Sequence, residues 1–163
     1  MKRKMICLCV FLTLLMIGSV SFAQDIPLVP LTPPIDPALI NIVGTWNYTA
    51  SASTVTGMCP AGPPGSGTIT ISGGAGAYTL VFVSGRVCSP ASMCTFTGTL
   101  TGNNLLVSNA DTVDNEGGSA GNALNLTVHN NGLITGNGSS SYIHPDGFEC
   151  HWSYTINMTR GTK

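Results

Sequence analysis

Residues 149–160 alternate between two kinds of side chain, and this pattern restricts the fold more than any other part of the sequence. Every second position is apolar or aromatic: Cys150, Trp152, Tyr154, Ile156 and Met158. The positions between them are polar: His151, Ser153, Thr155, Asn157 and Thr159. Because successive side chains of a β-strand point to opposite faces, the segment predicts a strand with one apolar face. No window after residue 40 spaces apolar residues as an amphipathic helix does, so we expect an all-β fold.

Seven other segments carry weaker forms of this alternation and are separated by residues that favour turns. The eight predicted strands are 43–52, 67–72, 77–84, 94–101, 104–110, 122–130, 133–142 and 149–160. In an up-and-down meander, successive connections fall at opposite ends of the sheet. The connections at 73–76, 102–103 and 131–132 are short, and Asn-Gly is typical of tight hairpins because it accepts positive φ. The intervening connections are long: 53–66, 85–93, 111–121 and 143–148.

The two ends of the predicted sheet therefore differ, with tight turns at one end and long loops at the other. A meander of about eight antiparallel strands has two exposed edges unless its first strand pairs with its last. Closure removes both edges and gives a small up-and-down barrel. It also brings Gly44 and Trp46, at the start of the first strand, close to Arg160 at the end of the last.

Gly44-Thr45-Trp46 on the first strand and Arg160 on the last resemble the pattern of the lipocalin and calycin superfamily, over about residues 40–160. The resemblance implies a small barrel whose floor Trp46 closes while Arg160 packs across it. Gly44, Trp46 and Arg160 are thus expected to form a structural plug. The helix that follows the barrel in typical lipocalins has no counterpart in the sequence. The layout is more similar to the minimal lipocalin-like domains of exported bacterial proteins.

Avidins are a lesser alternative for the resemblance. They carry an Asn two positions after this Trp as a biotin contact, and Tyr48 occupies that position here. Biotin binding is therefore not expected.

The N-terminal residues have the pattern of a secretory signal. Lys2, Arg3 and Lys4 precede an apolar run over 5–20, and small residues precede an expected cleavage after Ala23. An uncleaved anchor helix is the alternative, but the run is short for a span of about 20 residues. We expect a signal peptide at 1–23, a Pro-rich linker at 24–39 and a barrel domain at 40–163. The protein is then exported, periplasmic or extracellular, without membrane insertion after cleavage.

Cleavage would leave three of the six basic residues and all seven acidic ones, a formal net charge of −4. The remaining basic residues are Arg86, Arg160 and Lys163, so the sequence contains no basic patch. Nucleic acids and anionic membranes are therefore poor partners.

Four cysteines remain after the expected cleavage: Cys59, Cys88, Cys94 and Cys150. An even number in an exported chain predicts two disulfides, for which three connectivities exist. A zinc site is the alternative, but no Cys-x-x-Cys pair is present. We favour a local Cys88–Cys94 bond that closes one loop, with Cys59–Cys150 joining loops next to the last and first strands.

Two motifs could carry chemistry. Residues 117–121 match the Gly-x-Ser-x-Gly elbow around Ser119, but that motif requires a strand, a turn and then a helix. We interpret them as a flexible linker and expect no enzymatic activity. His144, Asp146 and His151 could bind a metal, but their spacing is not diagnostic and a Pro-Asp-Gly turn explains the segment. No metal or other cofactor is expected.

Large aromatic side chains on the predicted inner face can either fill the core or line a ligand cup. An eight-stranded barrel is just wide enough to pack solid or to hold one small molecule, and we favour a mostly packed interior. The candidate cup residues are Tyr48, Tyr78, Phe82, Phe96, Trp152 and Tyr154. The main hypothesis is a non-enzymatic exported binding protein that captures a small, partly apolar ligand or a protein partner at the long-loop end. The alternative is a structural or surface-interaction protein with a solid barrel.

Overall fold

A computed structural model describes residues 40–113 and 117–161 of the chain. The predicted signal peptide (1–23) and the predicted Pro-rich linker (24–39) lie outside the described residues. Within the described ranges, no helix is long and apolar enough to cross a membrane.

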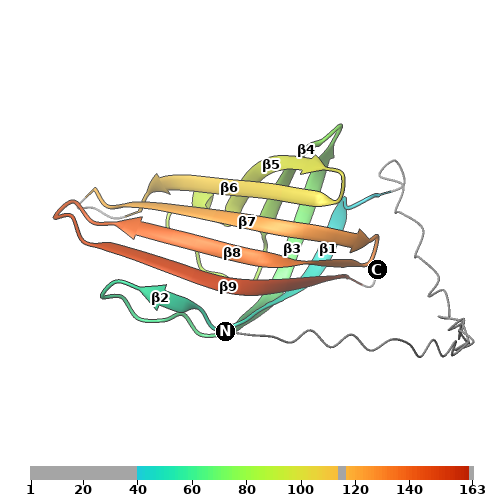
Figure 1. The fold of residues 1–163 in the computed structure, drawn as a ribbon. Helices are drawn as coiled ribbons and strands as arrows, with labels where there is room; N and C mark the ends of the chain where they lie inside the picture. The colour runs from blue at the N-terminus through green and yellow to red at the C-terminus, as the bar shows by residue number, and fades with distance from the viewer. Residues whose placement is uncertain (1–39, 114–116, 162–163) are drawn as a thin grey trace, which may run out of the picture. The chain divides into compact units, whose positions relative to one another are not determined.

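The described residues form nine β-strands and one short 3-10 helix, η2, at Ala91–Cys94 (Figure 1). The strands are β1 (Gly44–Ala50), β2 (Thr54–Thr56), β3 (Gly65–Gly74), β4 (Ala77–Phe82), β5 (Thr95–Thr101), β6 (Asn104–Thr112), β7 (Ser119–Asn130), β8 (Leu133–Ile143) and β9 (Glu149–Arg160). The prediction of an all-β fold is confirmed.

Eight antiparallel strands follow one another around a closed barrel in the order β1-β3-β4-β5-β6-β7-β8-β9. The barrel closes because β9 pairs with β1, with Trp46 opposite Arg160 and Ala50 opposite Ile156. All eight predicted strands are present, and their ends at the tight turns agree with the sequence-based bounds to within two residues. The up-and-down meander and its closure are therefore confirmed.

The largest differences from the predicted bounds lie at the long-loop end. The predicted loop 53–66 contains β2, which pairs with β9 through Thr54–Ser153 and Thr56–His151. The predicted loop 111–121 is shorter than expected, because β6 continues to Thr112 and β7 begins at Ser119. These segments pair their backbone groups without covering an apolar core, so they lack the alternation that marks the other strands.

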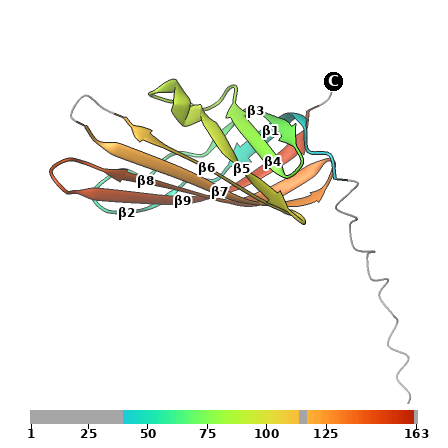
Figure 2. The same cartoon turned by 90° about the horizontal axis from the view of Figure 1, so that it is seen from above.

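Strands β6 to β9 continue beyond the barrel at the long-loop end, where β5 and β1 have ended (Figure 1). We call this extension the lip; it comprises residues 119–122 of β7, 140–143 of β8, 149–153 of β9, and β2. The connection from β4 to β5, residues 83–94, faces the lip across a shared hollow. Its helix η2 is held beside β6 because the Asn109 amide donates to the Met93 carbonyl oxygen (Figure 2).

The interior of the barrel is packed with apolar side chains. Aromatic and aliphatic side chains from all eight barrel strands are fully or almost fully buried there. The largest fully buried ones are Trp46, Phe96, Ile42, Ile69, Ile71, Leu80, Leu105, Leu124, Leu126, Ile134, Ile156 and Met158. This packed region is the core that holds the barrel together.

The floor of the barrel brings Gly44, Trp46 and Arg160 together. The Arg160 guanidinium carbon lies 4.6 Å from the centre of the Trp46 ring. The same guanidinium donates hydrogen bonds to the carbonyl oxygens of Asn131 (2.9 Å) and Val43 (2.6 Å). Gly44 has φ +130°, and a Cβ there would lie 2.9 Å from Arg160 Nη1. Glycine is thus required for Arg160 to cross the floor at this distance.

Two disulfides connect the loops at the open end. Cys59 is bonded to Cys150, and Cys88 is bonded to Cys94. The favoured connectivity is therefore confirmed. The first bond ties the β2–β3 connection to the lip, and the second closes the connection that carries η2.

Candidate functional site

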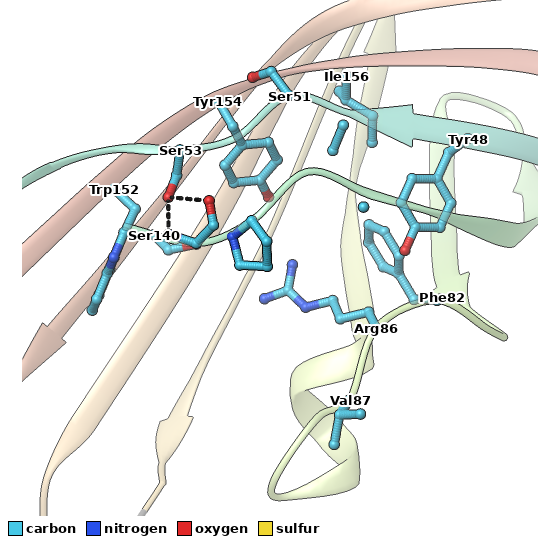
Figure 3. A pocket seen from close by; sticks show the side chains of 15 residues that line it. Tyr48, Ser51, Ser53, Phe82, Arg86, Val87, Ser140, Trp152, Tyr154 and Ile156 are labelled. Carbon is cyan, nitrogen blue, oxygen red and sulfur yellow. Dashed lines mark hydrogen bonds between the residues drawn. The ribbon is translucent and has the colours of Figure 1, made fainter. Parts of the chain in front are cut away.

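A cavity of about 420 Å³ opens at the long-loop end of the barrel (Figure 3). Its walls come from β1, the start of β3, the end of β4, β8, β9, the loop that follows β4 and the connections on either side of β2. The largest side chains that line it are Tyr48, Phe82, Arg86, Trp152, Tyr154 and Ile156. We call it the mouth cavity.

Small residues on the strands make room for the mouth cavity. Ala50 and Gly65 line it from β1 and β3, and Ser140 lines it from β8. Gly138, opposite Tyr154 on the neighbouring strand, lets the tyrosine ring lie flat against β8. A Cβ at Gly138 would be 2.2 Å from that ring, so any other residue would displace Tyr154.

Aromatic rings form the inner wall of the cavity. Tyr48 packs edge-to-face on Phe82 with ring centres 5.0 Å apart, and Phe82 packs on Phe96 at 5.5 Å. Edge-to-face and tilted contacts are the geometries that aromatic pairs prefer. The rings therefore support one another and give the cavity a firm apolar wall.

Arg86 brings a positive charge to this apolar wall. Its guanidinium carbon lies 5.3 Å from the centre of the Phe82 ring and 5.7 Å from that of Phe96. Attraction between a cation and aromatic faces at such distances stabilises the guanidinium there. Arg86 Nη2 also donates a hydrogen bond of 2.8 Å to Asn122 Oδ1.

A chain of amides behind Arg86 anchors it to the sheet. Ser140 Oγ donates to Asn122 Oδ1 at 2.6 Å, and Asn122 Nδ2 donates to Asn109 Oδ1 at 2.8 Å. Asn109 Nδ2 in turn donates to the carbonyl oxygens of Met93 and Thr95. Because each amide has a partner, the network fixes the position of the arginine.

Two tyrosine hydroxyls complete the polar groups of the cavity. The Tyr154 hydroxyl is buried and has no hydrogen-bond partner in the described part of the chain. Burial raises the pKa of the Tyr48 hydroxyl, an effect that the Arg86 charge opposes and that Tyr154 reinforces. Tyr48 thus remains neutral, and a hydrogen-bond donor, at neutral pH.

Four of the six predicted cup residues line the mouth cavity: Tyr48, Phe82, Trp152 and Tyr154. Tyr78 does not, because it pairs with Gly73 and Gly98 near the tight-turn end. It lies four positions from Phe82 along β4, a distance of about 13 Å. Phe96 is fully buried behind Phe82. Alternation identified the inner face correctly but not the depth of each residue along the barrel.

Arg86, Asn122 and Ser140 were not among the residues predicted for the site. Two signals could have indicated them. Arg86 is one of only three basic residues that remain after the expected cleavage. Asn122 and Ser140 face each other on β7 and β8 at inward positions, where a solid core would require apolar side chains.

Ser119 is the first residue of β7 and pairs with Thr112 and Ile143. The interpretation of 117–121 as a flexible linker was therefore wrong for 119–121, which lie in a strand. A nucleophile elbow requires a helix after the serine, and none follows Ser119 within residues 120–161.

The two histidines of the candidate metal motif each lie beside an acidic side chain. His144 stacks on Phe148 at 4.6 Å between ring centres, and its Nδ1 lies 3.5 Å from Asp146 Oδ2. His151 Nε2 lies 3.4 Å from Glu149 Oε2. Among the described residues, no three His, Cys, Asp or Glu side chains are grouped as metal ligands would be.

No protein-family model matches the chain, and no curated protein matches its sequence. The mouth cavity combines an apolar wall, one anchored cation and a few hydroxyls.

Proposed function

We propose that the protein is an exported, non-enzymatic, lipocalin-like binding protein that captures a small, partly apolar molecule in the mouth cavity. The observation that carries this proposal is the cavity itself, about 420 Å³ in volume. Ligand sites measure roughly 300–1,000 Å³ and combine apolar walls with a few placed polar groups. Tyr48, Phe82 and Trp152 supply such walls here, and Arg86 and Ser140 supply polar groups.

The lipocalin-like part of the proposal is supported by the architecture. The barrel is a closed eight-stranded meander with a packed floor at one end and a cavity at the other. The Arg160–Trp46 contact across the floor is the arrangement that the sequence resemblance implies.

Export is supported by two observations. Disulfides form and persist in oxidising compartments, and the protein has two of them. The basic and then apolar sequence of 1–23 has the pattern of a secretory signal. Both observations support a periplasmic or extracellular location.

The non-enzymatic part of the proposal is supported by the side chains around the cavity. Those that line it within the described chain include no His, Cys, Asp or Glu. General acid–base and nucleophilic catalysis usually depend on such groups. The arginine, hydroxyls and aromatic rings that are present can bind and orient a molecule.

Native mass spectrometry of protein purified from an exporting host tests the proposal. We expect a co-purifying small molecule with the wild-type protein, because binding would persist through gentle purification. Ala50→Phe should abolish it, since Ala50 lines the cavity. Thr49→Phe, on the exposed face of the same strand, is the matched control and should retain it. Absence of any bound mass from the wild-type protein across several growth conditions would contradict the proposal.

A protein partner at the rim is the second candidate, and exposed apolar side chains favour it. Val87 is 98% exposed and Met58 is 89% exposed, both on connections at the open end. A partner would cover these side chains. A protein-sized complex that is lost in both Val87→Asp and Met58→Asp, yet unaffected by Ala50→Phe, would favour this candidate over small-molecule binding.

A further inference from the structure

Arg86 has no counter-charge within the described chain. No Asp or Glu there forms an ion pair with it, and it is the only charged residue that lines the mouth cavity. Its charge is held by two aromatic faces and by the neutral Asn122 amide oxygen. A partly buried cation in apolar surroundings is stabilised further by an anion that approaches it.

The geometry of Arg86 leaves room for such an anion. A guanidinium has five N–H donors, and only the bond to Asn122 occupies them in the described structure. Phe82 and Phe96 lie near the guanidinium, and its tip projects into the space between Tyr154, Ser140 and Phe82 (Figure 3). A carboxylate can accept two parallel hydrogen bonds from the edge of a guanidinium.

Two tyrosines that line the same cavity as Arg86 carry hydroxyl donors. The buried, unpartnered Tyr154 hydroxyl belongs to a residue that lines the cavity, and the Tyr48 side chain lines it too. A buried hydroxyl without a partner is unfavourable, and a ligand oxygen would remove that penalty. Arg86 and the tyrosines thus provide donors and no charged acceptor.

We infer that the ligand of the mouth cavity is an amphipathic monocarboxylate, whose carboxylate binds Arg86 and whose apolar body lies against Trp152 and Ile156. This inference rests on the proposed function, and it specifies the chemical class of the ligand. One cation balances one negative charge, so a dianion would leave charge uncompensated beside apolar walls. A free inorganic anion would leave those walls without a partner.

Isothermal titration calorimetry with the secreted wild-type protein tests the inference. The probes are octanoate, octanamide, which has the same chain without the charge, and inorganic phosphate. We expect octanoate to bind roughly ten- to a hundredfold more tightly than octanamide, as hydrogen bonds to a charged group predict. Inorganic phosphate should not bind measurably.

Arg86 variants separate charge from shape. Arg86→Gln keeps an amide donor and a similar stem, so octanoate affinity should fall to that of octanamide, which should itself change little. Arg86→Lys keeps the positive charge but loses the paired N–H donors of the guanidinium. Its affinity for octanoate should lie between those of the wild type and Arg86→Gln. Urea unfolding curves of each variant check that the barrel is intact.

The outcomes of these titrations test the monocarboxylate inference separately from the proposed binding function. Equal affinities for octanoate and octanamide would overturn the monocarboxylate and leave a binding protein for neutral molecules. If phosphate binds more tightly than octanoate does, the inference that the ligand has an apolar body is wrong. If neither octanoate nor octanamide binds, the co-purifying mass decides: an acid that is lost in Arg86→Gln supports the inference, and a neutral molecule overturns it. If none of the probes binds and no small molecule co-purifies, the proposed function itself is contradicted.

Discussion

Trp46 is fully buried, donates its indole N–H to the Ile42 carbonyl oxygen at 2.8 Å and lies under the Arg160 guanidinium. A single side chain therefore joins the strand β1, the residues before it and the end of β9. Removal of the indole leaves a cavity in the floor and a carbonyl without its donor. Both effects destabilise the barrel.

Trp46→Ala should lower the free energy of unfolding by about 3–5 kcal/mol, as large-to-small core substitutions do. Urea unfolding followed by circular dichroism measures this change. Trp152→Ala, at the half-buried mouth, is the control and should have a smaller effect. Ligand binding at the open end should survive Trp46→Ala wherever the protein still folds. A stable Trp46→Ala protein that had lost binding would show that floor and mouth are not independent.

The raised pKa of Tyr48 leads us to expect that the protein loses stability at alkaline pH. Burial raises this pKa above the ordinary value of 10.0, so the folded state holds this proton more tightly than the unfolded state does. The resulting stability is fully present below pH 10 and is lost as the pH rises through the folded-state pKa. Unfolding free energies measured from about pH 8 to pH 12 should fall less steeply in Tyr48→Phe than in the wild type. Identical slopes would mean that Tyr48 does not couple folding to protonation.

At the scale of elements, the two disulfides act on different properties. Cys59–Cys150 closes a loop with a sequence separation of 91, whereas Cys88–Cys94 spans a separation of 6. A longer loop loses more entropy when it is closed in the unfolded chain, so the first bond stabilises the fold more. The second bond shapes the connection that carries Arg86.

The double variant Cys59→Ser/Cys150→Ser should lose about 4 kcal/mol of stability, and Cys88→Ser/Cys94→Ser about 2 kcal/mol. The losses of ligand affinity in the two variants should rank in the opposite order to their losses of stability. The Cys88–Cys94 pair restricts the segment around Arg86, so its removal should weaken binding more than the loss of Cys59–Cys150 does. Thermal unfolding and calorimetric titration of both variants test the two orders. The reverse order for binding would mean that the Cys88–Cys94 bond does not position Arg86.

Sequence alone predicted the elements that cover the core and missed those that do not. Most of the barrel strands place apolar residues at alternate positions over part of their length, and tight turns such as Asn131-Gly132 mark their ends. In β2 and the loop-side ends of β6 and β7, backbone pairing rather than burial maintains the strands, so composition gives no signal. The candidate site was predicted in part for the same reason. Tyr48 and Trp152 carried the inner-face pattern, whereas Arg86 comes from a loop whose path only the fold determines.

At the scale of the whole molecule, the two ends of the barrel domain meet at the floor. The Gly161 amide donates to the Thr45 carbonyl oxygen at 3.0 Å, and Arg160 donates to Val43. The turn at 131–132 belongs to the same junction, because its two carbonyl oxygens both accept hydrogen bonds from Arg160. Connections at the other end take no part in it.

A circular permutant should therefore fold if residues 161 and 40 are joined by a short flexible linker and the chain is opened within 113–118. Its melting temperature should remain close to that of the wild type, because no floor contact is cut. The matched control is a permutant opened at 131–132, which interrupts the acceptors of Arg160 and should be markedly less stable. Equal melting temperatures for the two permutants would show that the floor junction contributes little to stability.

The seam between β1 and β9 joins the first strand of the barrel that a ribosome makes to the last. Residues 149–160 form the last barrel strand to be made, and until then one edge of β1 has no partner. The Cys59–Cys150 disulfide likewise cannot form until Cys150 has been made. Pairings between such distant segments form slowly, on the order of milliseconds to seconds for all-β proteins. The barrel can therefore close only after β9 has been made, and a growing chain remains unclosed until then.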